Sequence, residues 1–232
     1  MSQAFFDQIR SGLIVSCQTG DNPEFSSPED MVKFARAAMA GGAYAIRSEG
    51  EDSLQAIKAA VNLPLIGLKK GYFQDGTVRI SRELKEIENM VKLGVDVVAI
   101  DATYRPWDGL DGPAIIQKVR AEFDVIVMAD ISSAEDGFAA VQAGAHCLST
   151  TLAGYTPQTQ ADKKTGPNLE LISQLVSKVD IPVIAEGRYN TPAEAISAMQ
   201  RGAWAVVVGS AITRPQLITS WFATALTQQG TA

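Results

Sequence analysis

The sequence contains very little cysteine and histidine. Among 232 residues, Cys17 and Cys147 are the two cysteines, each inside an apolar run, and His146 is the one histidine. Two thiols in a chain of this length suggest a reducing compartment rather than a disulfide framework. No Cys-x-x-Cys or His-x-x-x-His spacing is present, so the sequence gives no sign of a metal site. Acid–base chemistry must therefore use carboxylates, lysine, tyrosine or His146 alone.

Long apolar runs and an excess of basic residues are also lacking. No uninterrupted apolar stretch approaches the ~20 residues of a membrane span. Asp7 and Arg10 stand where a signal peptide needs an apolar core. The formal net charge of −6 argues against nucleic acid or an anionic membrane as a partner. We therefore expect a cytoplasmic protein that acts on a small molecule.

What the sequence does contain is a repeated unit: a short aliphatic run, a polar tip, and an amphipathic helix that ends in glycine. The junction from helix to strand recurs as "MAGGAYAIRSEG", "VKLGVDVVAIDAT", "VQAGAHCLSTTL" and "MQRGAWAVVVGS". Cap signals at Ser27, Ser133 and Thr191 mark helix starts. The predicted strands are Leu13–Gln18, Ala43–Glu49, Pro64–Lys70, Val95–Ala102, Val125–Ser132, Ala145–Thr151, Pro182–Arg188 and Ala203–Ser210.

Apolar strands that alternate with helices indicate a parallel sheet. Eight units in this length predict an α/β fold of the (β/α)8 barrel (TIM barrel) type, with a doubly wound open sheet as the competing interpretation. We expect one domain, residues 1–232, because no Gly/Ser/Pro-rich linker divides the chain. A short additional helix is expected at the N-terminus, and a helix over 215–227 completes the set.

In such a barrel the active site lies at the carboxyl ends of the strands. The seventh and eighth predicted strands end in glycine-containing loops followed by helix starts, which is the usual phosphate cradle of these barrels. The alternative is that these glycines only permit tight turns. The candidate phosphate-binding residues are Gly187, Gly209, Ser210 and Arg214.

Ionisable side chains at the other strand tips are candidates for chemistry. Lys69 and Lys70 end the third predicted strand, and because neighbouring strand residues face opposite sides, at most one points to the barrel axis. A desolvated lysine is a plausible general base, opposite the carboxylate of Glu186. Candidate substrate-binding residues at further tips are Gln18, Arg47, Asp130 and Thr151. Arg47 or Asp130 could instead belong to a rim salt bridge, as could Asp101, which lies beside Arg105. His146 begins its strand, at the opposite end of the barrel, and is interpreted as structural.

The segments "GLIVSCQ", "AIRSEG", "STTLAGYT", "VIAEGRYNTPAEA" and "GAWAVVVGSAITRP" together resemble the N-acetylmannosamine-6-phosphate 2-epimerases of bacterial sialic acid catabolism. The resemblance covers nearly the whole chain, in order. It implies interconversion of N-acetylmannosamine 6-phosphate and N-acetylglucosamine 6-phosphate on a (β/α)8 barrel, without a metal or redox cofactor. The oligomeric state does not follow from the sequence, and a homodimer is compatible with it.

Carried over residue by residue, the resemblance implies Lys70 as the catalytic lysine and Glu186 as its acid/base partner. The family lysine is usually followed by Arg and Asp, whereas this sequence has Gly71 and Tyr72, and the segment "DATYRPWDGLDG" also diverges. Two rival functions remain: a Schiff-base aldolase that uses the same lysine, and a phosphosugar-binding protein without turnover.

Overall fold

The computed structural model describes residues 2–18, 20, 23–162 and 166–229, and its central feature is a closed barrel of eight parallel strands. The barrel strands are β1 (Leu13–Cys17), β2 (Ala45–Glu49), β3 (Leu65–Leu68), β6 (Val97–Asp101), β7 (Ile126–Asp130), β8 (Cys147–Ser149), β9 (Val183–Glu186) and β10 (Ala205–Val208). Around the ring they follow the order β1, β10, β9, β8, β7, β6, β3, β2. The predicted (β/α)8 barrel is confirmed.

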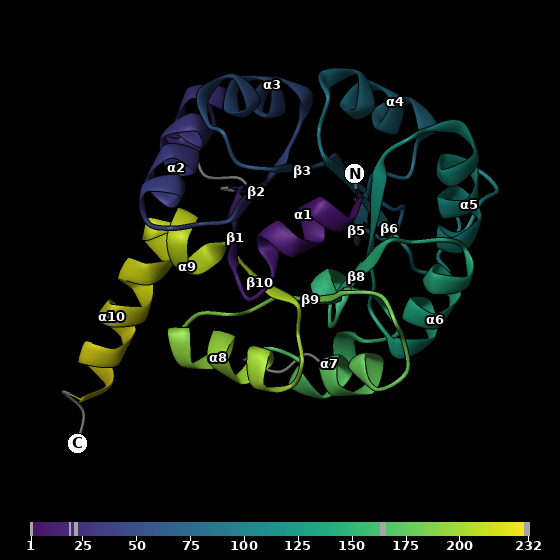
Figure 1. Cartoon of the computed structure of the whole chain (residues 1–232). Coiled ribbons are helices and arrows are strands. Elements are labelled where there is room, and N and C mark those ends of the chain that lie inside the picture. Colours follow the sequence, from purple (N-terminus) through teal and green to yellow (C-terminus); the bar gives the residue numbers. More distant parts are fainter. Residues whose placement is uncertain (1, 19, 21–22, 163–165, 230–232) are drawn as a thin grey trace.

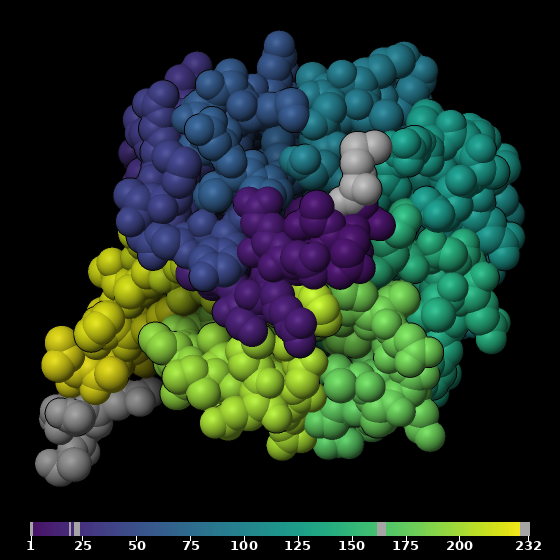
Figure 2. Space-filling model, viewed as in Figure 1, coloured from purple at the N-terminus to yellow at the C-terminus, as the bar shows by residue number. Residues whose placement is uncertain are grey.

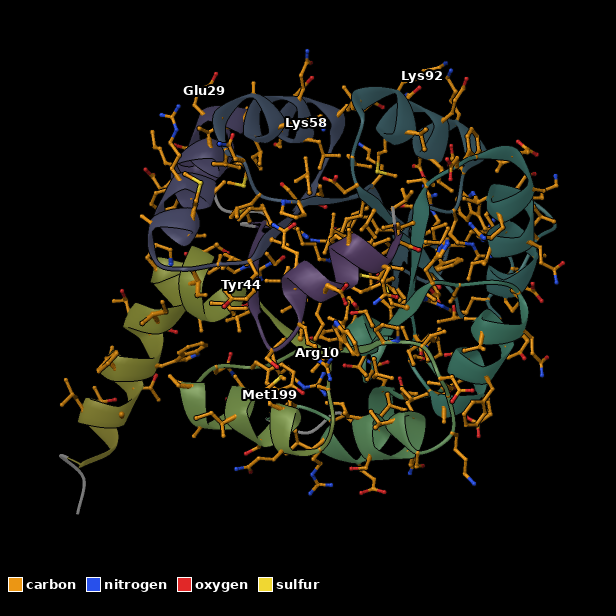
Figure 3. The ribbon with its side chains drawn as sticks, viewed as in Figure 1. Arg10, Glu29, Tyr44, Lys58, Lys92 and Met199 are labelled. Carbon is orange, nitrogen blue, oxygen red and sulfur yellow. The ribbon has the colours of Figure 1, made fainter. Side chains whose placement is uncertain are left out.

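Helices surround the barrel as an outer ring (Figure 1). They are α2 (Pro28–Ala40), α3 (Glu51–Ala60), α4 (Leu84–Leu93), α5 (Gly112–Glu122), α6 (Ala134–Gln142), α7 (Leu169–Val176) and α8 (Pro192–Gln200). The predicted caps at Ser27, Ser133 and Thr191 are confirmed, since each side chain accepts a hydrogen bond from the backbone N–H three residues on. Between ring and barrel lies the larger apolar core. The outer helix faces carry charged side chains such as Glu29 and Lys92 (Figure 3).

The N-terminal helix α1 (Ser2–Ile9) lies across the amino ends of the strands, in the centre of the face shown in Figure 2. Its Phe5, Phe6 and Ile9 are buried and join the apolar residues that fill the barrel interior. The indole N–H of Trp204 donates to the carbonyl of Phe6 at 2.8 Å. This end of the barrel is thereby closed, and the carboxyl ends of the strands form the opposite mouth.

One segment next to the barrel differs from the sequence-based expectation. The third barrel strand ends at Leu68, and the chain then forms a separate antiparallel hairpin of β4 (Lys70–Tyr72) and β5 (Val78–Ile80). Asp75 and Gly76 make its turn, with Gly76 at φ 79°. An Asp-Gly pair between β-forming residues is a hairpin signal. Because Lys70 pairs with Ile80 in this hairpin, the barrel strand ends earlier than in the predicted range Pro64–Lys70.

The C-terminal end also differs. β10 ends at Val208, and Ser210 begins the short helix α9 (Ser210–Thr213). α10 (Pro215–Gln229) lies where a helix was predicted, but it points away from the barrel (Figure 1), and its residues from Thr219 to Thr227 are exposed. Among the described residues, no helix is long and apolar enough to cross a membrane.

Candidate active site

A polar cavity of about 260 Å³ opens at the carboxyl ends of the barrel strands. Of the predicted site residues, all except Asp130 line it: Gln18, Arg47, Lys70, Thr151, Glu186, Gly187, Gly209, Ser210 and Arg214. Asp130 ends β7 and is fully buried behind Arg47. Residues from distant parts of the sequence thus converge because parallel strands end on the same side of the barrel.

An ion cluster forms one wall of this cavity. Arg47, 1% exposed, makes a two-point contact with Asp130, with Nη1–Oδ1 at 3.2 Å and Nη2–Oδ2 at 2.6 Å. Its Nε lies 3.3 Å from Oε1 of Glu186. The Thr151 hydroxyl donates to Asp130 Oδ1 at 2.8 Å, and the Ser149 hydroxyl donates to Glu186 Oε2 at 3.1 Å. One guanidinium therefore holds two carboxylates in place.

Burial and neighbouring charges shift the pKa values of both Glu186 and Arg47. Burial raises the pKa of Glu186, Asp130 raises it further, and Arg47 opposes both. Burial alone would lower the pKa of Arg47, but the charges of Asp130 and Glu186 outweigh it and raise that pKa. Arg47 thus stays charged, while Glu186 holds a proton more readily than an exposed glutamate. A carboxyl of this kind is suited to acid–base exchange.

Lys70 enters the cavity from the β4–β5 hairpin. Its Nζ lies 3.5 Å from Oε2 of Glu49, at the end of β2. Burial lowers the pKa of Lys70, and the positive charges of Arg214 and Arg47 add to this effect, whereas Glu49 raises it. A lysine with a lowered pKa is more often neutral near pH 7 and can accept a proton. The adjacent Lys69 is exposed and does not line the cavity.

The opposite side of the cavity carries groups that are able to bind an anion. Gly187 follows β9 with φ 107°, a conformation that only glycine adopts easily. Gly209 and Ser210 follow β10, where the first N–H groups of α9 have no partner within the helix. Arg214 brings a guanidinium to the same side, and its Nε donates to the carbonyl of Gln18 at 3.4 Å. Backbone N–H groups and one guanidinium are the groups that bind phosphate in such barrels.

Several cavity residues were not selected from the sequence. Val78 and Ile80 line the cavity from the hairpin, which was not predicted. Arg188 lines it as well, in a left-handed conformation at φ 62°, and its guanidinium donates to the carbonyls of Ala153 and Gly166, each at 2.8 Å. Arg188 could have been selected from the sequence because it stands at the end of a predicted strand. The hairpin could have been predicted from its Asp-Gly turn.

Fold and site together define a class: a (β/α)8 barrel with one cavity at the strand ends, lined by a lysine of lowered pKa, a glutamate of raised pKa and groups able to bind an anion. A family model described as "Putative N-acetylmannosamine-6-phosphate epimerase" matches residues 31–228. The chain belongs to this N-acetylmannosamine-6-phosphate epimerase family.

Individual proteins agree with the family match. A protein of Caldanaerobacter subterraneus named "Putative N-acetylmannosamine-6-phosphate 2-epimerase" is 43% identical over 97% of this chain and 94% of its own length. The solved structure of the N-acetylmannosamine-6-phosphate 2-epimerase from Clostridium perfringens superposes with a TM-score of 0.88, at 39% identity over 95% of each chain. Thiamine phosphate pyrophosphorylase from Pyrococcus furiosus, at 16% identity and a TM-score of 0.59 over 90% of this chain and 89% of its own, shares the fold alone.

Proposed function

We propose that this protein interconverts N-acetylmannosamine 6-phosphate and N-acetylglucosamine 6-phosphate by removing and returning the proton on C2, in amino sugar catabolism. The observation that carries the proposal is one cavity that joins Lys70, with its lowered pKa, to the Arg47–Glu186 pair and an anion-binding corner. Family membership supports the substrate.

The chemistry follows from the groups present. Ring opening gives an aldehyde at C1, which acidifies the hydrogen on C2. Lys70 is the proposed base that takes this proton, and loss of a positioned general base typically costs ~10²–10⁴ in rate. Glu186, whose pKa is raised by burial, is the proposed acid/base for ring opening or for proton return. Inverting a centre in this way moves protons and no net electrons, so the proposal includes neither a metal nor a redox cofactor.

The remaining candidates hold the substrate. Gly187, Gly209, Ser210 and Arg214 bind the 6-phosphate in this proposal, which fixes C2 relative to Lys70. Gln18, Arg47, Asp130 and Thr151 are the proposed contacts or supports for the sugar oxygens and the N-acetyl group. Because Asp130 is fully buried and held by Arg47 and Thr151, we assign it the supporting role.

Proton NMR of N-acetylmannosamine 6-phosphate with the enzyme in D2O tests the proposal directly. We expect N-acetylglucosamine 6-phosphate to appear with deuterium at C2. Tight binding without C2 exchange would instead support a binding protein, and borohydride inactivation in the presence of substrate would support a Schiff-base aldolase. Either result contradicts the proposed reaction.

The assembly and location complete the proposal. α10 exposes Trp221, Phe222 and Leu226, with 70% of Phe222 accessible, and an apolar helix face of this kind is normally covered by a partner. We assign this cover to a second copy of the chain, in a cytoplasmic homodimer. Sedimentation of the wild type beside a Phe222→Glu/Leu226→Glu variant checks the assignment: a monomeric wild type contradicts it.

A further inference from the structure

The proposed base does not belong to a barrel strand. Lys70 is the first residue of β4, which pairs with β5 and places Lys70 opposite Ile80 and Gly71 opposite Arg79. A two-stranded hairpin is marginally stable by itself. The position of the Lys70 amine therefore depends on the contacts that fix this hairpin to the rest of the molecule.

The first contact runs through Arg79. Its guanidinium occupies the space beside Gly71, where an added Cβ would lie 2.5 Å from Arg79 Nη2. The Trp107 ring covers the guanidinium, with Cζ 4.2 Å from the ring centroid. Glu86 and Glu83 bind the same guanidinium at 3.2 Å each, which ties the hairpin to the start of α4. Gly71 and Trp107 thus hold Arg79 between them.

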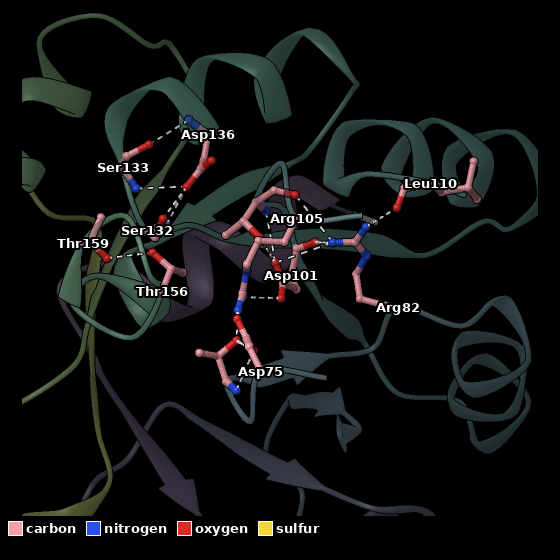
Figure 4. Close-up of polar contacts among 12 residues, drawn as sticks. Asp75, Arg82, Asp101, Arg105, Leu110, Ser132, Ser133, Asp136, Thr156 and Thr159 are labelled. Carbon is pink, nitrogen blue, oxygen red and sulfur yellow. Dashed lines mark hydrogen bonds and ion pairs between the residues drawn. The ribbon is translucent and has the colours of Figure 1, made fainter. Parts of the chain in front are cut away.

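The second contact runs through Arg105, at the centre of Figure 4. Its Nη2 donates to Oδ2 of the fully buried Asp101 at 2.8 Å, and its Nε donates to the Thr103 hydroxyl at 2.9 Å. Its Nη1 donates across to the hydroxyl of Thr77 at the hairpin turn, also at 2.9 Å. The guanidinium lies 4.2 Å over the ring of Phe73. Arg105 therefore links the end of β6 to the tip of the hairpin.

The segment that carries Trp107 is itself fixed. Trp107 and Leu110 exchange two backbone hydrogen bonds, at 2.8 and 3.0 Å. Arg82, which follows the hairpin, donates to the Leu110 carbonyl at 2.6 Å and to the Thr103 carbonyl at 3.5 Å (Figure 4). The rings of Phe73 and Trp107 meet edge to face at 5.9 Å. Two aromatic rings and two guanidinium groups thus form a continuous stack between hairpin and barrel.

We propose that this stack, made of Phe73, Arg79, Arg105 and Trp107, sets the position of the Lys70 amine in the cavity, with Trp107 as a positioning residue. The inference rests on the proposed role of Lys70 as the C2 base. Trp107 does not line the cavity and acts only through the hairpin. The anion-binding corner follows β9 and β10 and contains no residue of the stack, so phosphosugar binding is expected to be independent of it.

The test compares the effect of Trp107→Leu on the rate of C2 exchange with its effect on phosphosugar binding. We expect C2 exchange at saturating N-acetylmannosamine 6-phosphate to fall on the order of 10²-fold, because a misplacement of about 1 Å has that effect. The dissociation constant of N-acetylglucosamine 6-phosphate, measured by calorimetry, should stay at the wild-type value. Trp107→Phe, which keeps a ring over Arg79, should restore most of the rate. Tyr104→Ala is the matched control, since Tyr104 is 55% exposed in the same segment.

A second variant approaches the stack from the hairpin side. Gly71→Ala adds one methyl group that displaces the Arg79 guanidinium, so it should slow exchange as Trp107→Leu does. The double variant should be no slower than the slower single variant, because both break the same contact.

The outcomes separate this inference from the proposed function. If the wild type shows no C2 exchange, the proposed function is wrong. If the wild type exchanges while Trp107→Leu keeps its rate, or loses rate and binding in equal measure, the positioning role alone is wrong. Additive effects of Gly71→Ala and Trp107→Leu would contradict it in the same way.

Discussion

Replacement of Arg47 by methionine is the most informative perturbation of the ion cluster. The substitution keeps an unbranched side chain but removes the charge that holds Asp130, fully buried, and Glu186, 13% exposed in its side chain. Breaking a buried ion pair by removing one partner costs about 3–5 kcal/mol, because the other charge stays buried and unpaired. At roughly 2–4 °C per kcal/mol for a chain of this size, Tm should fall by roughly 6–20 °C.

The destabilisation by Arg47→Met should depend on pH with a definite sign. The pKa of Glu186 in the folded protein already lies above its ordinary value because of burial, and loss of Arg47 raises it further. A carboxyl with a raised folded pKa contributes stability that is fully present below its unfolded pKa, about 4.3, and is lost as pH rises through the folded pKa. The difference in Tm between variant and wild type should therefore be small near about pH 5 and larger near about pH 8.

Thermal and urea unfolding at both pH values provide the measurement. The matched control is Arg47→Met/Asp130→Asn, in which one of the two orphaned carboxylates has been removed. This double variant should recover part of the lost stability and show a smaller pH dependence. An Arg47→Met variant with wild-type stability at both pH values, or an equal loss at both, would refute the reasoning.

Three further predictions concern activity. Lys70→Met should lower C2 exchange by ~10²–10⁴ while Lys69→Met keeps most of it, and an active Lys70 variant beside an inactive Lys69 variant would contradict the assignment of the base. Glu49→Gln removes a carboxylate 3.5 Å from the Lys70 amine and should lower the pKa of Lys70. The acidic limb of the rate–pH profile should therefore move to lower pH. If the limb does not move, it reports the titration of another group. Arg214→Ala should raise the KM for the phosphosugar by roughly 10–150-fold, the equivalent of one charge-assisted hydrogen bond, with a smaller effect on the rate at saturation. If N-acetylmannosamine and N-acetylmannosamine 6-phosphate turned over equally well, the assignment of the anion-binding corner to the phosphate would be wrong.

The barrel was predictable because its signals are local and repeated. Most barrel strands are aliphatic runs buried on both faces, such as Val97–Asp101. The capped helix starts at Ser27, Ser133 and Thr191 stand directly in the sequence. Because the strands of such a barrel are parallel, the polar residues at their carboxyl ends must lie around the same mouth. This geometric rule, more than any motif, places Arg47 and Glu186 near each other.

The parts that were not predictable depend on tertiary contacts. Asp130 and Glu186 look alike as strand tips, and only the two-point contact with Arg47 shows that the first is a buried support and the second faces the cavity. α10 has a helical pattern, but no local signal shows that it leaves the barrel. The Phe73–Trp107 contact joins segments more than thirty residues apart, and neither residue indicates the other.

The two departures from the family pattern, at Gly71 and in the segment around Trp107, are parts of one structural unit. A Cβ at position 71 would lie 2.5 Å from Nη2 and 2.9 Å from Cζ of Arg79, so a side chain at position 71 and the present position of Arg79 exclude each other. The Trp107 ring lies on this same guanidinium. The Arg79 guanidinium of β5 therefore fills the space beside β4 that a side chain at position 71 would need, and the Trp107 ring covers it there. An arginine introduced at position 71 alone would displace Arg79 from both Trp107 and Glu86. Gly71 and Trp107, thirty-six positions later, thus act on the same guanidinium.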